Sequence, residues 1–251
     1  MSGHSKWSTI KRKKGANDAK RGKLFTKIAR EIQAAARMGG PDPDSNIRLR
    51  FALDKAKAAN MPKDNIKRAI DRGAGTDKGA DLEESIYEGY APHGVAVIVE
   101  VLTDNKNRTV AELRHAFTRG GGNLAANGAV AWQFERKGQI SVKMDGVDPD
   151  ELFMVAADAG AEDIDFDDET LAHITTADTD LGAVRDALIE AGYEIEDLEL
   201  AMIPKMEVAL PVDQAMKVMG LLERLEDLDD VQKVYSNLTM SDELMAQLEA
   251  A

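Results

Sequence analysis

The residue pattern of the chain changes once, near residue 75, and this change strongly limits the folds available to it. Before that point alanine, lysine and arginine dominate, and apolar residues recur at helical spacing. Glycines and prolines divide this part into three expected helices, over 17–40, 45–60 and 62–73. Residues 73–81 combine glycine, threonine and charges without apolar periodicity, which is typical of a linker. The sequence therefore predicts a helical domain first and a different fold after it.

From Tyr87 onward, β-rich runs alternate with helical stretches. The expected strands span 95–102, 129–134, 139–144, 162–167, 171–176, 194–203, 206–210 and 231–235. The expected helices between them span 108–119, 149–159, 181–191 and 212–225. Units of this kind form sheets with helices packed on one face. The predicted fold class is thus α+β with several domains: an N-terminal three-helix bundle followed by two small α/β domains of the ferredoxin-like kind.

Charge is distributed very unevenly along the chain, whose net charge is -13. Residues 1–75 hold 19 Lys and Arg against 7 Asp and Glu, whereas residues 142–251 hold 6 against 29. A basic segment carried by an acidic body indicates binding to a polyanion such as nucleic acid. The alternative is an internal dipole, in which the acidic part neutralises the basic part within the molecule. In both alternatives the cations before residue 75 are the residues that bind the acidic partner.

Cations gather on one face of the first expected helix. At about 100° per residue they fall within an arc of roughly 100°, opposite an apolar face that includes Phe25, Ile28 and Ile32. Only Glu31 borders them, whereas a solvated face normally mixes both signs, so phosphate contact is favoured over simple solvation. Replacing the first three cations by Glu is expected to abolish nucleic-acid binding. We call this set the cationic stripe: Lys20, Lys23, Lys27, Arg30 and Arg37.

A basic arm precedes this helix and surrounds Trp7. The arm has little means of building a core, so it is expected to order on a polyanion. Trp7 can stack on an exposed base, a contact worth about 1–3 kcal/mol, or anchor the arm to the helical domain, and the sequence leaves both open. No side chains are recognisably placed to read bases, so sequence specificity is expected to be weak. The cations of the arm are Lys6, Lys11, Arg12, Lys13 and Lys14. Later cations that could widen the surface are Arg48, Arg50, Lys55, Lys57, Lys63, Lys67, Arg68 and Arg72.

The sequence offers no recognisable catalytic or metal-binding arrangement. Cysteine is absent, and the four histidines are scattered without a paired-ligand motif. A non-enzymatic protein without catalytic residues, metal or cofactor is therefore expected. The longest apolar run, 95–99, is far shorter than the ~20 residues of a membrane span, and no signal-peptide pattern is present. We expect a cytoplasmic protein without a membrane partner.

Several short runs of the sequence are distinctive in combination. They are GHSKW (3–7), DAKRGKLFTKI (18–28), RLR (48–50), NMP (60–62), YEGYAP (87–92), TDNKNRT (103–109) and RHAFTRGGGNL (114–124). Together they resemble the YebC family of probable transcriptional regulators, which includes the mitochondrial translational activator of cytochrome c oxidase. The similarity covers most of residues 3–138. Two positions depart from the family pattern: the run 11–14 lacks a His common there, and His93 stands where relatives often have Gly.

The resemblance implies three domains, with the third inserted in the second. The helical domain would span 1–75, the central α/β domain 76–137 plus 205–251, and the inserted acidic α/β domain 138–204. It also implies one of two functions. The first is DNA-binding transcriptional regulation; the second is a ribosome-associated translation factor that relieves stalling at proline runs and places the arm against ribosomal RNA. In both, the acidic α/β domains are available for protein contacts. An adaptor that binds only protein, and an enzyme, are weaker alternatives.

Overall fold

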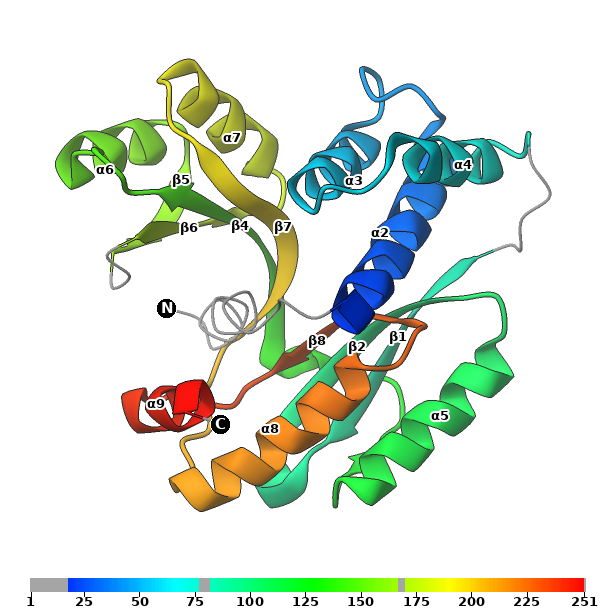
Figure 1. Cartoon of the computed structure of the whole chain (residues 1–251). Helices are drawn as coiled ribbons and strands as arrows, with labels where there is room; N and C mark the ends of the chain where they lie inside the picture. The colour runs from blue at the N-terminus through cyan, green and yellow to red at the C-terminus, as the bar shows by residue number, and fades with distance from the viewer. Residues whose placement is uncertain (1–17, 77–81, 167–169, 251) are drawn as a thin grey trace. The chain divides into compact units, whose positions relative to one another are not determined.

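The computed structural model describes residues 18–76, 82–166 and 170–250, and Figure 1 shows its architecture. Within these residues the chain forms eight α-helices and two four-stranded antiparallel sheets, so the predicted α+β multidomain class is confirmed. The chain divides into two compact units. The larger unit contains the described residues up to Trp132 and those from Glu207 on, and the smaller unit contains Gln133–Met206. The boundaries expected for three domains stay a prediction.

Three helices form the bundle predicted for the N-terminal part: α2 (Asp18–Gly39), α3 (Ile47–Ala58) and α4 (Lys63–Gly73). Their apolar faces close a common core in which Ile32, Leu49 and Ala52 are fully buried. Asn46 turns the chain into α3, because its side chain accepts from the Leu49 N–H at 3.1 Å and donates to the Ala35 carbonyl at 2.8 Å. The predicted three-helix bundle is confirmed.

The larger unit also contains a sheet with helices packed on it. Its elements are β1 (Glu83–Tyr90), β2 (Ala96–Thr103), α5 (Lys106–Arg119), β3 (Asn123–Leu124), α8 (Val212–Glu226), β8 (Val231–Ser236) and α9 (Asp242–Ala250). The strand order is β3-β1-β2-β8. The central strand β2 is buried along nearly its whole length, which explains the apolar run in its sequence. Helices α5 and α8 lie side by side over one face, where Phe117 and Leu221 are fully buried (Figure 1).

The smaller unit is a second antiparallel sheet with two helices. Its elements are β4 (Phe134–Lys143), α6 (Pro149–Asp158), β5 (Ala161–Asp165), β6 (Leu171–Ala177), α7 (Leu181–Glu190) and β7 (Ile195–Pro204). The βαββαβ succession and the strand order β5-β6-β4-β7 are those of a ferredoxin-like domain. The sheet of the larger unit has a ββαβαβ succession, because β1 and β2 follow each other directly across the short turn η1 (Pro92–Gly94). Ferredoxin-like connectivity is therefore confined to the smaller unit.

Two of the expected strands are wrong. The stretch 129–134 is a loop that ends in the short turn η2 (Ala131–Gln133), and only its last residue belongs to β4. The backbone N–H groups of Val130 and Ala131 donate to the side chain of Glu88 and not to a neighbouring strand. The stretch 206–210 makes only an isolated bridge, between Val208 and Leu238.

Three elements of the larger unit were not predicted: strand β1, the two-residue strand β3 and helix α9. Strand β1 carries the sequence EESIYEGY, in which acidic residues interrupt the apolar alternation that indicates a strand. Its acidic side chains have specific partners: Glu83 pairs with Lys106, Glu84 with Arg48. Helix α9 is short, and among its described side chains Leu244 and Leu248 are buried. The local sequence pattern predicts an element poorly where contacts with distant residues stabilise it.

Candidate nucleic-acid interface

Some of the predicted binding residues lie in the part of the chain that the structure describes, and others lie outside it. Lys20 lies in α2, but its side chain is not among those described. Arg37 is exposed in the last turn of α2. The residues that lie outside the described part are Lys6, Trp7, Lys11, Arg12, Lys13 and Lys14. The structure therefore places four members of the cationic stripe, which are Lys23, Lys27, Arg30 and Arg37.

Three members of the cationic stripe, Lys23, Lys27 and Arg30, contact the end of α8 and the α8–β8 loop, residues 227–230. Lys23 Nζ lies 3.1 Å from Asp227 Oδ1 and donates to the Asp227 carbonyl at 3.2 Å. Lys27 Nζ donates to the Glu226 carbonyl at 2.7 Å. These lysines, which are predicted to bind phosphate, contact oxygens of the protein itself. At Lys23, whose partner is a carboxylate, the structure supplies the internal neutralisation that the charge pattern left as an alternative.

Asp230 is the centre of this contact and has only 2% of its surface exposed. Arg30 Nη1 lies 2.7 Å from its Oδ1, and Arg108 Nη2 lies 2.9 Å from its Oδ2. The hydroxyls of Thr109 and Thr103 donate to Oδ2 at 2.7 and 3.0 Å. Burial by itself would raise the pKa of Asp230, but hydrogen bonds from Arg108, the two threonines and Arg30 outweigh it and lower the pKa. The buried carboxylate is therefore charged at neutral pH.

The run TDNKNRT supplies most of this network. Thr103 ends β2, and Arg108 and Thr109 lie in the first turn of α5, whose start is capped by Asn105 through the Arg108 N–H at 3.1 Å. Sequence reasoning missed Asp230, which follows Thr103 by 127 residues. The run itself could have predicted a carboxylate site here, since two threonines and an arginine at fixed spacing around a helix start can bind one carboxylate.

Helix α4 presents cations that the described part of the protein does not use. Ile66 and Ile70 pack against the bundle core, whereas Lys63 and Lys67 are exposed. Among the described residues neither lysine has an ion-pair or hydrogen-bond partner. The two are four residues apart and so lie one above the other on the helix. They can meet neighbouring phosphates of one nucleic-acid backbone.

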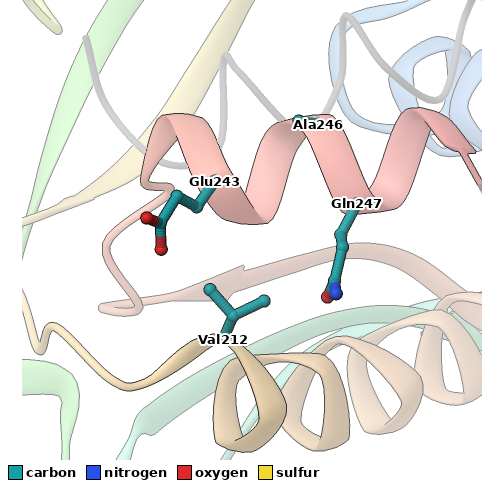
Figure 2. Close-up of a pocket in the computed structure, with 4 residues that line it drawn as sticks. All are labelled: Val212, Glu243, Ala246 and Gln247. Atoms are coloured by element: carbon teal, nitrogen blue, oxygen red, sulfur yellow. The ribbon is translucent and has the colours of Figure 1, made fainter.

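The structure contains a pocket between the start of α8 and α9. It is lined by Val212, Glu243, Ala246 and Gln247 (Figure 2). Glu243 is the one charged residue of these four, and its carboxylate repels phosphate. In the part of the chain that the structure describes, no group of three or more His, Asp or Glu could hold a metal ion. No described helix is long and apolar enough to cross a membrane. The candidate interface is therefore a set of surface cations, separate from this pocket.

Family models match nearly the whole chain. The TACO1/YebC protein N-terminal domain matches residues 5–76, and the TACO1/YebC second and third domain matches residues 82–238. The chain belongs to the TACO1/YebC family. The resemblance found in the sequence is thus confirmed.

Similar members of the TACO1/YebC family carry a regulatory name. A "Probable transcriptional regulatory protein" of Bifidobacterium longum (strain DJO10A) is 55% identical over 250 residues, which cover 99% of each chain. A protein of the same description from Pseudomonas putida is 54% identical over 248 residues, covering 99% of this chain and 100% of its own. The crystal structure of a conserved hypothetical protein, Aq1575 from Aquifex aeolicus, is 48% identical in sequence with a TM-score of 0.83. That match covers 90% of this chain and 93% of the other.

Proposed function

We propose that this chain is a nucleic-acid-binding regulator of gene expression, which acts by binding and not by catalysis. The observation that carries the proposal is that cations of the basic helical bundle stay exposed and unpaired on the described surface, at Lys63 and Lys67. A phosphate that meets such an ammonium group releases counterions, and this release favours binding to a polyanion. The names of the relatives, probable transcriptional regulatory proteins, support DNA as the partner and transcription as the process.

The members of the cationic stripe have different parts in this proposal. The pair between Lys23 and Asp227 is exposed, with 46% and 73% of the two side chains accessible. Exposed pairs contribute only about 0–1 kcal/mol, so a phosphate can replace Asp227 as the partner of Lys23. The pair between Arg30 and Asp230 is different, because only 3% of the Asp230 side chain is accessible and removing a partner leaves a buried charge. Arg30 therefore holds the bundle in place, while Lys23 remains available to nucleic acid.

In this proposal the basic arm adds further phosphate contacts. Its five cations would follow the phosphate backbone, and Trp7 would stack on a base or anchor the arm. Lys20 and Arg37, at the two ends of the cationic stripe, complete the proposed contact set. Weak sequence specificity follows, because contacts to phosphate position a protein on nucleic acid without reading bases.

A ribosome-associated translation factor is the second candidate, and the division of charge along the chain favours it. Residues 1–75 hold 19 Lys and Arg against 7 Asp and Glu, whereas residues 142–251 hold 29 Asp and Glu against 6 Lys and Arg. A partner that combines phosphate with basic protein, as a ribosome does, matches both parts. Naked DNA matches only the first. In this case the chain would act as a translational activator that relieves stalling at proline runs, with the acidic domains against protein.

Binding measurements at several salt concentrations test the proposal and separate the two partners. The purified chain is titrated into labelled duplex DNA and, separately, sedimented with intact ribosomes. Salt-sensitive binding to the duplex without co-sedimentation supports transcription, and salt-sensitive co-sedimentation supports translation. Absence of both overturns the proposal. The control variant is Lys217→Glu with Arg224→Glu, which reverses the charge of two exposed cations of α8 outside the bundle. It should bind as the wild type does.

A further inference from the structure

The larger unit presents a large aromatic ring on a loop. Trp132 lies in the turn η2, at the end of the loop that follows β3, and 66% of its surface is exposed. It is one of only two tryptophans in the chain. Tryptophan is highly buried on average, because its large ring gains more than most side chains from leaving water. An exposed tryptophan on an ordered loop therefore indicates a contact surface.

A buried carboxylate fixes this loop. Glu88 of β1 is only 5% exposed, and its Oε1 accepts from the Gly128 N–H at 2.6 Å. Its Oε2 accepts from the N–H groups of Val130 and Ala131 at 2.7 and 2.8 Å. Burial by itself would raise the pKa of Glu88, but these three hydrogen bonds outweigh it and lower the pKa. Hydrogen bonds to an ionised carboxylate are strong, so they hold the loop in one conformation.

The polar edge of the indole is already satisfied within the loop. Trp132 Nε1 donates to the Ala129 carbonyl at 3.1 Å, and the hydroxyl of Tyr90 donates to the same oxygen at 3.0 Å. The indole N–H therefore needs no further acceptor, and this hydrogen bond orients the ring. The ring offers its apolar π-face to a ligand. A flat, aromatic group is the ligand that fits such a face best.

The rest of the loop narrows the class of ligand. Residues 125–132 contain no charged side chain, so the loop itself offers no cation to a phosphate. In the proposed function the bundle supplies the phosphate contacts. A nucleic acid held by its backbone on those cations still has bases to place, and bases stack on tryptophan whatever their identity.

We propose that Trp132 stacks on an unpaired base of a single-stranded nucleic acid. The proposal rests on the proposed function and deepens it, because it adds a base contact to the phosphate contacts of the bundle. A fixed ring at the surface meets only a base that has left its own stack, so a single strand fits and an intact duplex does not. Every base has a π-face, so the contact is tolerant of sequence.

The test uses the full chain with Trp7→Phe, in which Trp132 is the only tryptophan. Oligothymidylate and oligouridylate of about 12 nucleotides, a duplex, and heparin are titrated, with Trp132 emission recorded beside binding. We expect single strands to quench the emission in step with binding. Heparin, which has charge but no bases, should bind without quenching. Quenching by the duplex as strong as that by single strands would overturn the assignment to single strands.

Substitution of the ring gives a second readout. Trp132→Ala should weaken single-strand binding about 5- to 140-fold, whereas Trp132→Phe, which keeps an aromatic face, should weaken it far less. Both variants should fold, because the ring is exposed. Unchanged affinity of Trp132→Ala, together with unquenched Trp132 emission in the Trp7→Phe chain, overturns the stacking proposal and leaves the proposed function standing. If the wild type binds no nucleic acid at all, both proposals fail.

Discussion

Arg30 and Asp230 lie 200 residues apart in the sequence and form a buried ion pair in the fold, with 2.7 Å between Nη1 and Oδ1. The pair joins the helical bundle to the sheet of the larger unit, because Arg30 belongs to α2 and Asp230 immediately precedes β8. Part of the charge gradient along the chain is therefore used inside the molecule. The cations that the fold leaves exposed are the ones available to a ligand.

Replacing Asp230 by Asn should destabilise the larger unit strongly. The change leaves the guanidinium group of Arg30 without the buried carboxylate that pairs with it, while Arg108 keeps its second partner, Asp104. Breaking a buried pair in this way costs about 3–5 kcal/mol. Urea unfolding followed by circular dichroism measures the loss. Asp227→Asn is the matched control, since its exposed pair with Lys23 contributes about 0–1 kcal/mol. Equal stability of the two variants would contradict the docking role of Asp230.

Stability should also fall in acid. The pKa values of Asp230 and Glu88 are lowered in the folded chain from their usual 3.8 and 4.5. A lowered folded pKa gives stabilisation that is complete above the usual value and is lost as the pH drops through the folded value. The urea midpoint should therefore stay level from about pH 7 to about pH 5 and fall below about pH 4. Asp230→Asn should flatten the acid decline, and a decline as steep as that of the wild type would assign it to other groups.

Replacing Lys23 and Arg30 by Gln, one at a time, should have different effects on nucleic-acid affinity and on stability. Lys23→Gln removes a cation whose internal partner is exposed, so nucleic-acid affinity should fall while the urea midpoint stays within experimental error. Arg30→Gln removes a buried partner of Asp230, so the midpoint should fall clearly. Neutral Gln is preferable to Glu here, because a glutamate at position 23 would also repel Asp227. A large loss of stability in Lys23→Gln would show that both residues serve docking alone.

Glu88 should affect the stacking of Trp132 on bases, because it fixes the loop that carries the ring. Glu88→Gln replaces a carboxylate, which accepts three backbone hydrogen bonds, by an amide with one acceptor oxygen. Amide hydrogen exchange of Gly128, Val130 and Ala131 should become faster, and the quenching of Trp132 by single strands should weaken although the ring is intact. Glu88→Asp keeps the charge and serves as the partial rescue. Unchanged exchange in Glu88→Gln would show that the loop is held by other contacts.

The sequence predicted best where local pattern decides the structure. Apolar residues at helical spacing were enough for the bundle, and its three helices begin and end within a few residues of the expected bounds. The continuous apolar run 95–102 likewise predicted strand β2. Strand β1 was missed, because its glutamates are stabilised by distant partners such as Arg48 and Lys106.

The expected strand 129–134 failed for a related reason. Its residues are apolar enough for a strand. The N–H groups of Val130 and Ala131, however, donate to the carboxylate of Glu88, which holds this segment in a loop. The cationic stripe shows the same limit for function. Helical spacing correctly placed its described members on one helix, whereas a helical wheel carries no information about an acidic loop 200 residues further on.

The salt dependence of nucleic-acid binding tests the central claim most directly. Affinity for labelled duplex DNA and for ribosomal RNA is measured over a range of salt concentrations for the wild type, Lys63→Gln with Lys67→Gln, and the control Lys217→Gln with Arg224→Gln. If the α4 lysines meet phosphates, the slope of log affinity against log salt for duplex DNA should become shallower by about 0.9 for each lysine that no longer neutralises a phosphate, and the control should keep the wild-type slope. The same slope in all three proteins would contradict nucleic-acid binding by the helical bundle at this surface.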